Sequence, residues 1–295
     1  MERYDIAIIG TGPAGLSAAV TATIRNKRVL LLGSRDLSEK LEKAREIRNY
    51  LGFPAVKGPD LAAAFGRHLD EMGIRITEKR ISAVYAMGEY FALQSGEETL
   101  EATAVILATG VVQAKPLPGE EALLGRGVSY CATCDAPLYR GKTAAVIGYS
   151  PREESEAAFL SEVCGRVLYF PVYPQEPRLP AGVAVIREKV LEIGETEGGR
   201  VVRTAEGEYP ADGVFVLREA IAPNRLVPGL ETEDGHVKVD RKMRASLPGA
   251  FACGDVTGAP YQYIKAAGEG NVAAISAAVY VDMKKKQREK QEGGK

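Results

Sequence analysis

Near-continuous apolar runs alternate with helical patterns at the start of the chain, as is typical of an α/β protein. Residues 4–10 (YDIAIIG) read as a strand buried on both faces, the stretch LSAAVTATIRN has a helical pattern, and residues 28–33 (RVLLLG) form the next apolar run. This order of strand, helix and strand predicts a parallel βαβ unit.

Further apolar patterns predict the remaining elements. Residues 60–73 and 261–281 have helical spacing, and the segments ISAVYAM, EYFALQS and AVILATG read as strands between residues 81 and 110. A second βαβ-like unit begins at AAVIG (144–148), with a helix over 152–163 and strands near 166–170, 182–187, 200–204 and 213–217. Residues 250–255 (AFACGD) predict one more buried strand. The charged tail MKKKQREKQEGGK lacks an apolar face, so we expect it to fray in solvent.

A stretch rich in proline and glycine, KPLPGEEALLGRG, separates the two units and predicts a linker. We therefore expect an α/β fold with two nucleotide-binding-type (Rossmann-like) domains, the second inserted in the first. The first domain is assigned to residues 1–112 and 243–295, and the second to residues 113–242. The chain has 295 residues, which is long enough for two separate cores.

Composition narrows the class of function. The chain carries 38 basic and 39 acidic side chains and a net charge of −1, which argues against a nucleic-acid or anionic-membrane partner. No segment reaches the roughly 18 apolar residues of a membrane span. The N-terminus reads as a strand rather than a signal peptide, so we expect a cytoplasmic protein. Four cysteines are too few for a disulfide scaffold.

A glycine loop joins the first strand to the first helix. Gly10-Thr11-Gly12-Pro13-Ala14-Gly15 matches the G-x-G-x-x-G pattern of dinucleotide-binding proteins. The first glycine makes the tight turn, the second lets the backbone approach a pyrophosphate, and the third lets the helix pack against the strand. The loop therefore predicts a dinucleotide cofactor.

Two later segments favour FAD as that cofactor. The strand AVILATG ends at Thr109-Gly110, and AFACGDVTG contains Gly254-Asp255, whose carboxylate can accept hydrogen bonds from a ribityl hydroxyl. The second strand ends in Gly33-Ser34-Arg35, without the acidic residue that often holds a ribose. Ser34 or the backbone is expected to substitute for it.

A pair of closely spaced thiols, Cys131-Ala132-Thr133-Cys134, can close a small redox-active disulfide ring. If the pair begins a helix, the helix dipole would lower a thiolate pKa. Asp135 could carry a proton to or from the departing thiolate. Two unrelated buried cysteines and a structural metal pair are the alternatives. We expect no metal site, because the chain has only two histidines and because Cys164 and Cys253 are isolated.

The glycine loop, the ATG turn, the PGE linker, CATCD and the C-terminal Gly-Asp segment occur in the order found in low-molecular-weight thioredoxin reductases, which this chain resembles. The resemblance implies FAD, a flavin-facing role for Cys134 and a mixed disulfide between Cys131 and thioredoxin. It also implies that residues of the segment with Lys40 and Asn49 contact the flavin. Gln262 and Tyr263 follow a turn, and we expect them to contact the flavin, with plain packing as the alternative.

The second glycine loop of that family binds NADPH, and here it is altered. Gly148-Tyr149-Ser150-Pro151-Arg152-Glu153-Glu154 has Ser150 and Glu153 at the second and third glycine positions. Ser150 adds a side chain where the pyrophosphate must approach, and the two glutamates place negative charge where the phosphates would lie. Residues 170–176 (FPVYPQE) also lack the basic cluster that binds the 2′-phosphate. We therefore expect no tight NADPH binding.

The whole pattern resembles ferredoxin-dependent flavin thioredoxin reductases, a branch of that family. The matching segments are residues 33–38, 49–53, 131–138, the altered Gly148-Tyr149 loop, and residues 260–263 and 265–270. The branch implies a two-domain homodimer in which ferredoxin delivers two single electrons to FAD, which passes a pair to the disulfide and on to thioredoxin. An NADPH-dependent thioredoxin reductase and a flavin redox sensor without turnover are the alternatives.

Overall fold

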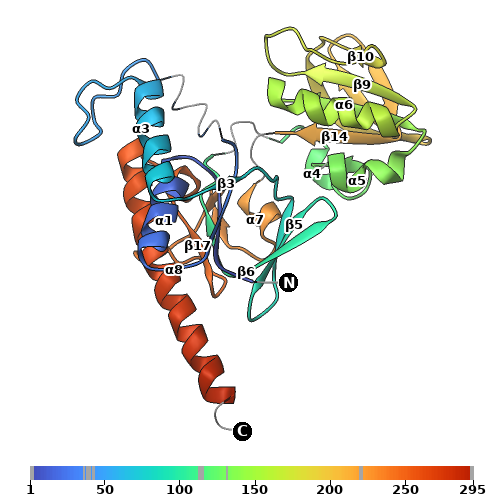
Figure 1. Cartoon of the computed structure of the whole chain (residues 1–295). Helices are drawn as coiled ribbons and strands as arrows, with labels where there is room; N and C mark the ends of the chain where they lie inside the picture. The colour runs from blue at the N-terminus through green and yellow to red at the C-terminus, as the bar shows by residue number, and fades with distance from the viewer. Residues whose placement is uncertain are drawn as a thin grey trace. The chain divides into compact units, whose positions relative to one another are not determined.

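The computed structural model describes residues 3–35, 37, 41, 44–111, 116–130, 132–218 and 222–292. The chain forms two compact units, Met1–Val111 with Ala222–Lys295, and Val112–Ile221. Figure 1 shows their elements along the chain. The predicted α/β fold, with one Rossmann-like domain inserted in the other, is confirmed.

The chain returns to the first unit at Ala222 rather than at residue 243, where the sequence analysis places the boundary. Helix α7 (Pro223–Leu226) contacts strand β4, and strand β16 (His236–Val237) contacts the 3-10 turn η3 (Gly254–Thr257), so both belong to the first unit. The apolar side chains of Leu226, Val227 and Val237 are buried there. This burial explains why the chain rejoins the first unit at Ala222, before the predicted position.

The first unit is built on a seven-stranded sheet with the order β3-β2-β1-β6-β5-β4, and β17 also pairs with β6. Its strands are β1 (Tyr4–Ile9), β2 (Val29–Leu32), β3 (Ile76–Thr77), β4 (Ala83–Ala86), β5 (Phe91–Ser95), β6 (Glu98–Leu107) and β17 (Ala250–Ala252). Strands β1, β2, β3, β6 and β17 are parallel, whereas β4 and β5 form an antiparallel meander with β6. A short hairpin of β15 (Thr232–Glu233) and β16 stands apart.

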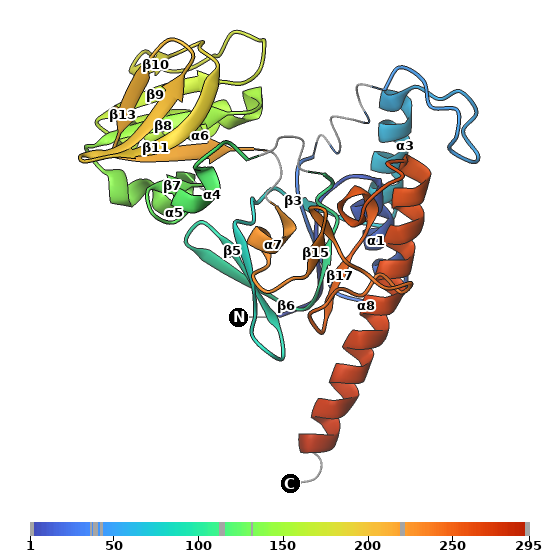
Figure 2. The ribbon, with the colours of Figure 1, turned by 180° about the vertical axis from the view of Figure 1, so that it is seen from behind.

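The longest helices among the described residues of this unit are α1 (Pro13–Ile24), α3 (Gly58–Glu71) and α8 (Tyr263–Glu292). Helices α1 and α8 lie side by side in both views (Figures 1 and 2). Small residues allow their backbones to approach: a Cβ added at Gly270 would lie 2.1 Å from the Ala14 carbonyl oxygen. The small residues around this contact, such as Ala273 and Ala277, are fully buried.

The described part of the C-terminal tail is helical, although fraying was predicted, because α8 continues to Glu292. Ion pairs attach the last turns to the body of the unit: Lys284 binds Glu89 at 2.9 Å and Lys285 binds Asp5 at 2.8 Å. A helical segment without an apolar face can thus be attached to the rest of the unit by ion pairs of its charged side chains.

The second unit contains a parallel sheet with the order β10-β9-β8-β14-β7 and an antiparallel sheet with the order β11-β12-β13. The strands are β7 (Val128–Ser129), β8 (Thr143–Gly148), β9 (Arg166–Pro171), β10 (Val183–Val185), β11 (Val190–Thr196), β12 (Gly199–Thr204), β13 (Glu208–Ala211) and β14 (Gly213–Leu217). Strands β11 and β13 are absent from the sequence prediction, because their charged residues and Pro210 mask the apolar alternation.

Short helices complete the second unit. They are α4 (Glu120–Leu123), α5 (Ala132–Asp135) with the turn η1 (Ala136–Tyr139), and α6 (Glu154–Val163) after the turn η2 (Pro151–Glu153). Across the residues that the structure describes, we find no helix that combines the length and the apolar character of a membrane span.

Candidate active site

Four parallel strands of the first unit end at one edge, where a dinucleotide is expected. Ile9 pairs with Leu32 and with Leu107, and Leu107 pairs with Ala252. The segments that follow these strands therefore meet there: the glycine loop, Gly33-Ser34, Thr109-Gly110 and Gly254-Asp255. Ligands of open α/β sheets bind at this carboxyl edge.

The three glycines of the first loop have different structural roles. A Cβ at Gly10 would lie 2.2 Å from the Ala108 carbonyl oxygen, and one at Gly15 would lie 1.9 Å from the Gly10 oxygen. These two glycines therefore allow close packing of the protein's own backbone. At Gly12 no atom of the described structure lies within 4 Å of an added Cβ. The space beside Gly12 is thus open to a ligand.

The amino end of α1 suits an anion. Pro13 opens the helix, Gly12 provides no side-chain cap, and no acidic residue lies in the first turn. The first amide groups of such a helix, together with its dipole, favour a phosphate. The loop residues therefore fit the pyrophosphate of a dinucleotide.

Thr11 joins the loop to the end of β2. Its hydroxyl donates to the Ser34 carbonyl oxygen at 2.8 Å and its side chain is buried. An added Cβ at Gly33 would lie 2.7 Å from the Thr11 Cγ2 atom, so the glycine is needed for this contact. The prediction that Ser34 or the backbone stands in for the missing acidic residue is compatible with this arrangement but is not tested by it.

A hydrogen-bonded cluster holds the Gly254-Asp255 turn. The Glu269 carboxylate accepts a hydrogen bond from the Gly254 amide at 2.8 Å and from the Thr257 hydroxyl at 3.0 Å, and Lys265 pairs with it at 3.1 Å. A Cβ at Gly254 would lie 2.8 Å from the Ala14 Cβ, which places the turn against the glycine loop. Residues 265–270 belong to the segments that carry the family resemblance, but the sequence pattern did not indicate this role of Glu269.

Three of the four other predicted flavin contacts lie in the described part of the chain. Tyr263 begins α8, and it packs against the same buried cluster around Leu41 as Tyr50, the residue after Asn49. Burial, and to a smaller extent the charge of Asp255, raise the pKa of Tyr263. Gln262 and Asn49 are exposed. Lys40 lies outside the described residues.

The thiol pair belongs to the second unit. Cys131 lies outside the described residues, whereas the backbones of Cys134 and Asp135 form the end of α5. Burial raises the pKa of Tyr139, and the carboxylate of Asp135 raises it further, so Asp135 lies close to this phenol. Among the described residues, no three His, Cys, Asp or Glu side chains are grouped as metal ligands would be.

The first glycine of the altered loop packs against a buried tyrosine, Tyr169. A Cβ at Gly148 would lie 2.1 Å from the Tyr169 hydroxyl oxygen. Tyr173 donates to the Glu154 carboxylate at 2.6 Å, so the hydroxyl contact of 3.1 Å between Tyr169 and Tyr173 has Tyr169 as donor. Burial is the main cause that raises the pKa of Tyr169 to about 12.

The two glutamates of this loop do not face solvent freely. Glu154 also accepts a hydrogen bond from the Arg178 amide at 2.9 Å, and Glu153 is buried. The Ser150 hydroxyl is buried without a hydrogen-bond partner in the described part of the chain. Protein atoms thus fill the surroundings of this loop, in addition to the charge that the sequence indicates.

A second group of side chains, which we call the Glu120 cluster, consists of Glu120, Tyr130, Tyr149 and Arg218. Tyr149 follows β8 and Arg218 follows β14, and the strand order reverses between these two strands. That reversal is the point where dinucleotides bind in such sheets. The Arg218 guanidinium lies 4.4 Å from the centre of the Tyr149 ring. An arginine–tyrosine stack therefore lies at this point of the second sheet.

Glu120 holds this stack in place. Arg218 donates to both of its carboxylate oxygens, with 2.7 Å between Nη2 and Oε2, and Tyr130 donates to Oε1 at 2.8 Å. The Glu120 side chain is 0% exposed. Burial alone would raise the pKa of Glu120, but the hydrogen bonds from Arg218, the Leu117 amide and Tyr130 lower it. Sequence reasoning missed the cluster, although an arginine directly after the buried strand GVFVL was a usable signal.

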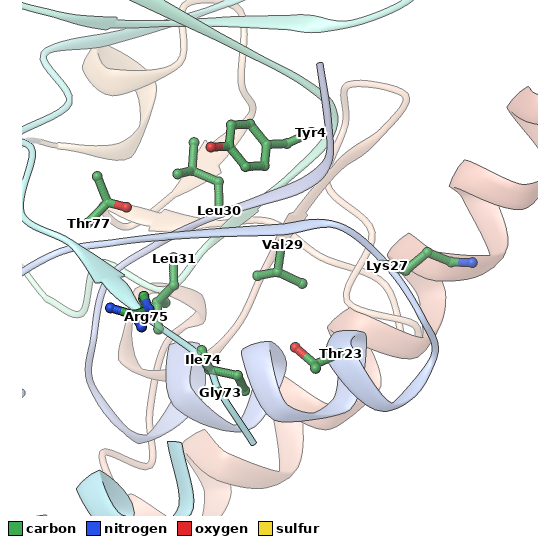
Figure 3. Close-up of a pocket in the computed structure, with 10 residues that line it drawn as sticks. All are labelled: Tyr4, Thr23, Lys27, Val29, Leu30, Leu31, Gly73, Ile74, Arg75 and Thr77. Carbon is green, nitrogen blue, oxygen red and sulfur yellow. The ribbon is translucent and has the colours of Figure 1, made fainter. Parts of the chain in front are cut away.

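A pocket of about 350 Å³ lies elsewhere in the first unit. Figure 3 shows its lining, which includes Tyr4 at the start of β1 and Thr23 and Lys27 near the end of α1. These residues mark the amino ends of β1 and β2. The pocket is therefore distinct from the dinucleotide edge.

The chain was compared with known proteins. Residues 4–161 and 176–270 match the family described as pyridine nucleotide-disulphide oxidoreductase. Thioredoxin reductase of Bacillus subtilis is 30% identical over 302 residues, which cover 95% of either chain.

Solved structures are also similar. A ferredoxin-flavin thioredoxin reductase from Clostridium acetobutylicum is 48% identical, with a TM-score of 0.92 and coverage of 97% of this chain and 99% of the other. A thioredoxin reductase from Gloeobacter violaceus is 28% identical, with a TM-score of 0.82 and coverage of 96% of each chain.

Proposed function

This chain belongs to the pyridine nucleotide-disulphide oxidoreductase family and, within it, to the thioredoxin reductases, and we propose that it carries electrons from reduced ferredoxin through FAD and Cys131-Cys134 to thioredoxin. The predicted resemblance to ferredoxin-dependent flavin thioredoxin reductases is confirmed by the 48% identical structure. The predicted enzyme class, a flavin-dependent thioredoxin-disulfide reductase, is confirmed by the same relatives.

The Glu120 cluster of the second unit is the main support for the proposed electron donor. NADPH would have to displace the Arg218–Tyr149 stack and separate a buried carboxylate from its cation, and breaking such a pair costs about 3–5 kcal/mol. These features favour a donor that needs no nucleotide pocket, such as a one-electron carrier protein. Ferredoxin is the carrier in the name of the 48% identical relative.

The edge of the first unit supports FAD as the cofactor. Gly12 leaves open space beside an uncapped helix, and the Glu269 cluster holds Gly254-Asp255 next to Ala14. Bound there, FAD supplies the conversion of two single electrons into a pair. The residues proposed to bind it are Gly10, Thr11, Gly12, Pro13, Ala14, Gly15, Gly33, Ser34, Lys40, Asn49, Thr109, Gly110, Gly254, Asp255, Gln262 and Tyr263.

The thiol pair is proposed to pass the electrons on. The Cys131 thiolate attacks the disulfide of oxidised thioredoxin and forms a mixed disulfide, and one thioredoxin sulfur leaves as a thiolate. Cys134 then attacks Cys131, which closes the enzyme disulfide and releases the second thioredoxin sulfur. Asp135, at the end of α5, is proposed to move a proton to or from the Cys134 sulfur.

An apolar stripe supports the expected homodimer. Val272, Ile275, Val279 and Met283 repeat at helical spacing on α8, and each is at least 36% exposed. A second copy of the chain would cover this stripe. We further propose a cytoplasmic location, where thiols stay reduced, because Cys164 and Cys253 are unpaired and buried.

The test is an anaerobic mixing experiment. The yellow protein is mixed with NADPH and, separately, with reduced ferredoxin, and the loss of flavin absorbance is followed before oxidised thioredoxin is added. We expect ferredoxin alone to bleach the flavin and thioredoxin to restore the colour. Rapid bleaching by NADPH would establish the nicotinamide-dependent alternative. Bleaching by ferredoxin without reduction of thioredoxin would indicate a sensor.

A further inference from the structure

The turn that carries Asp255 begins where the hydrogen bonds of the first sheet end. Strand β17 ends at Ala252, and the Cys253 amide still bonds to the Leu107 carbonyl oxygen at 2.9 Å. The next residue, Gly254, is buried and has a φ of +82°, which glycine adopts readily. Its amide and carbonyl groups need partners from outside the sheet, because an unpaired buried backbone group is costly.

Two side chains of α8 supply these partners. Glu269 accepts a hydrogen bond from the Gly254 amide at 2.8 Å, and Lys265 donates to the Gly254 carbonyl oxygen at 3.1 Å. Lys265 also donates to the Gly258 carbonyl oxygen at 2.8 Å, so it reaches from the start of the turn to the residue after it. The Thr257 hydroxyl lies 2.8 Å from the Gly254 carbonyl oxygen and 3.0 Å from Glu269. One helix thus sets the shape of the turn.

Lys265 lies at an unfavourable position of its own helix. It is in the first turn of α8, where the helix dipole disfavours a cation, and no acidic residue of the described helix lies in that turn to compensate. Its i,i+4 pair with Glu269, at 3.1 Å, adds little to a helix when the lysine comes first. Both side chains are nevertheless only 18% and 20% exposed. Their contacts with the turn, rather than those within the helix, therefore account for their positions.

We propose that Glu269 is a positioning residue for FAD, which together with Lys265 holds the Gly254-Asp255 turn in its binding conformation before the cofactor arrives. The inference rests on the proposed use of FAD. Affinity falls in proportion to the fraction of the protein that has the binding conformation. A hydrogen bond to a charged group changes such an equilibrium by a factor of about ten or more. Without the carboxylate, the turn should therefore spend most of its time in other conformations.

The experiment measures the release of FAD from the full-length holoprotein. Each protein is loaded with FAD, separated from excess cofactor by gel filtration and diluted in steps. Free FAD is more fluorescent than protein-bound FAD, so the fluorescence at each dilution gives the dissociation constant. The measurement needs neither ferredoxin nor thioredoxin, and it is independent of turnover.

The informative variant is Glu269→Ala, in which the dissociation constant of FAD should rise at least about tenfold. Glu269→Gln keeps an oxygen that can accept the hydrogen bond of the Gly254 amide, so it should recover part of this loss. The matched control is Asp282→Ala, which removes another carboxylate of α8, one that pairs with Lys27 at 2.6 Å. Asp282 lies about 20 Å along the helix from Glu269, so this control should bind FAD as the wild-type protein does.

Wild-type affinity in Glu269→Ala overturns the inference, and so does a Glu269→Gln variant that binds FAD no better than Glu269→Ala. An equal loss in Asp282→Ala also overturns it, because the effect would then come from the stability of the helix in general. If Glu269→Ala does not fold, Thr257→Val removes only the hydroxyl beside the carboxylate. It should weaken FAD binding about threefold or more, and an unchanged constant overturns the inference. A wild-type protein that retains no FAD would instead reject the proposed function.

Discussion

The Arg218 guanidinium stacks 4.4 Å from the centre of the Tyr149 ring and forms an ion pair with the buried Glu120. The two stacked residues follow neighbouring parallel strands at the carboxyl edge of the second sheet. The protein's own side chains thus lie at the point where other sheets of this kind bind a dinucleotide.

Replacing Arg218 with methionine should destabilise the protein by about 3–5 kcal/mol, because Glu120 would remain buried without its cation. Denaturant unfolding measures this change. The double variant Arg218→Met with Glu120→Gln should recover part of the loss, since it leaves no buried charge. Equal stability of the single variant and the wild-type protein would contradict the assigned role of the pair.

The same pair predicts a pH dependence. The folded-state pKa of Glu120 is lowered from its ordinary value of 4.5, so its charge stabilises the fold above that value and the contribution is lost as the pH falls through the folded pKa. The difference in unfolding free energy between the wild-type protein and Glu120→Gln should therefore shrink between pH 7 and pH 3. A constant difference across this range would show that the charge of Glu120 does not contribute.

Substitutions at two glycines of the first loop should affect cofactor binding and folding separately. Gly12→Ala should fold normally but lose flavin affinity at least about tenfold, because its methyl group enters the space open to the pyrophosphate. Gly15→Ala should lose on the order of 3 kcal/mol of stability, since its Cβ would meet the Gly10 carbonyl oxygen. Flavin absorbance after gel filtration and thermal unfolding measure the two effects.

Gly66→Ala is the matched control for these variants. Gly66 lies inside α3, and no described atom lies within 4 Å of an added Cβ there. The substitution should keep the flavin and gain up to about 1 kcal/mol of helix stability. Full flavin retention by Gly12→Ala would argue against the placement of the cofactor.

Cys134→Ser should retain FAD and its reduction by ferredoxin but abolish electron transfer to thioredoxin. The reason is that the serine hydroxyl cannot form the disulfide that carries the electron pair. Insulin reduction coupled to thioredoxin measures the loss. Cys164→Ser, which alters a buried single cysteine of the same unit, should remain active. Retained disulfide reduction by Cys134→Ser would reject the assignment of the pair.

High salt should release the end of α8. The Debye length falls to about 3 Å at 1 M salt, which weakens the partly exposed pairs of Lys284 with Glu89 and Lys285 with Asp5. Hydrogen exchange should then accelerate over residues 284–292 and stay slow near Val281. Lys284→Gln should have the same effect at low salt, whereas Lys286→Gln, at an exposed neighbouring position, should not.

The sequence was sufficient to predict those features that depend on residues close together along the chain. The spacing of Gly10, Gly12 and Gly15 predicted the loop, and the apolar run before it predicted the buried strand that positions it. The missing glycines at Ser150 and Glu153 likewise indicated an altered second loop. Such features follow from local backbone geometry and periodicity, so the residues themselves carry the signal.

The tertiary structure decided what depends on residues far apart in the chain. Glu120 and Arg218 are separated by 98 positions, and only the order of the strands brings them together beside Tyr149. In the same way, Lys284 and Lys285 form ion pairs with Glu89 and Asp5, which are distant in sequence. The described tail is therefore helical, although its composition predicted fraying. Long-range partners are set by packing, because the free energy of a buried or paired charge depends on what surrounds it.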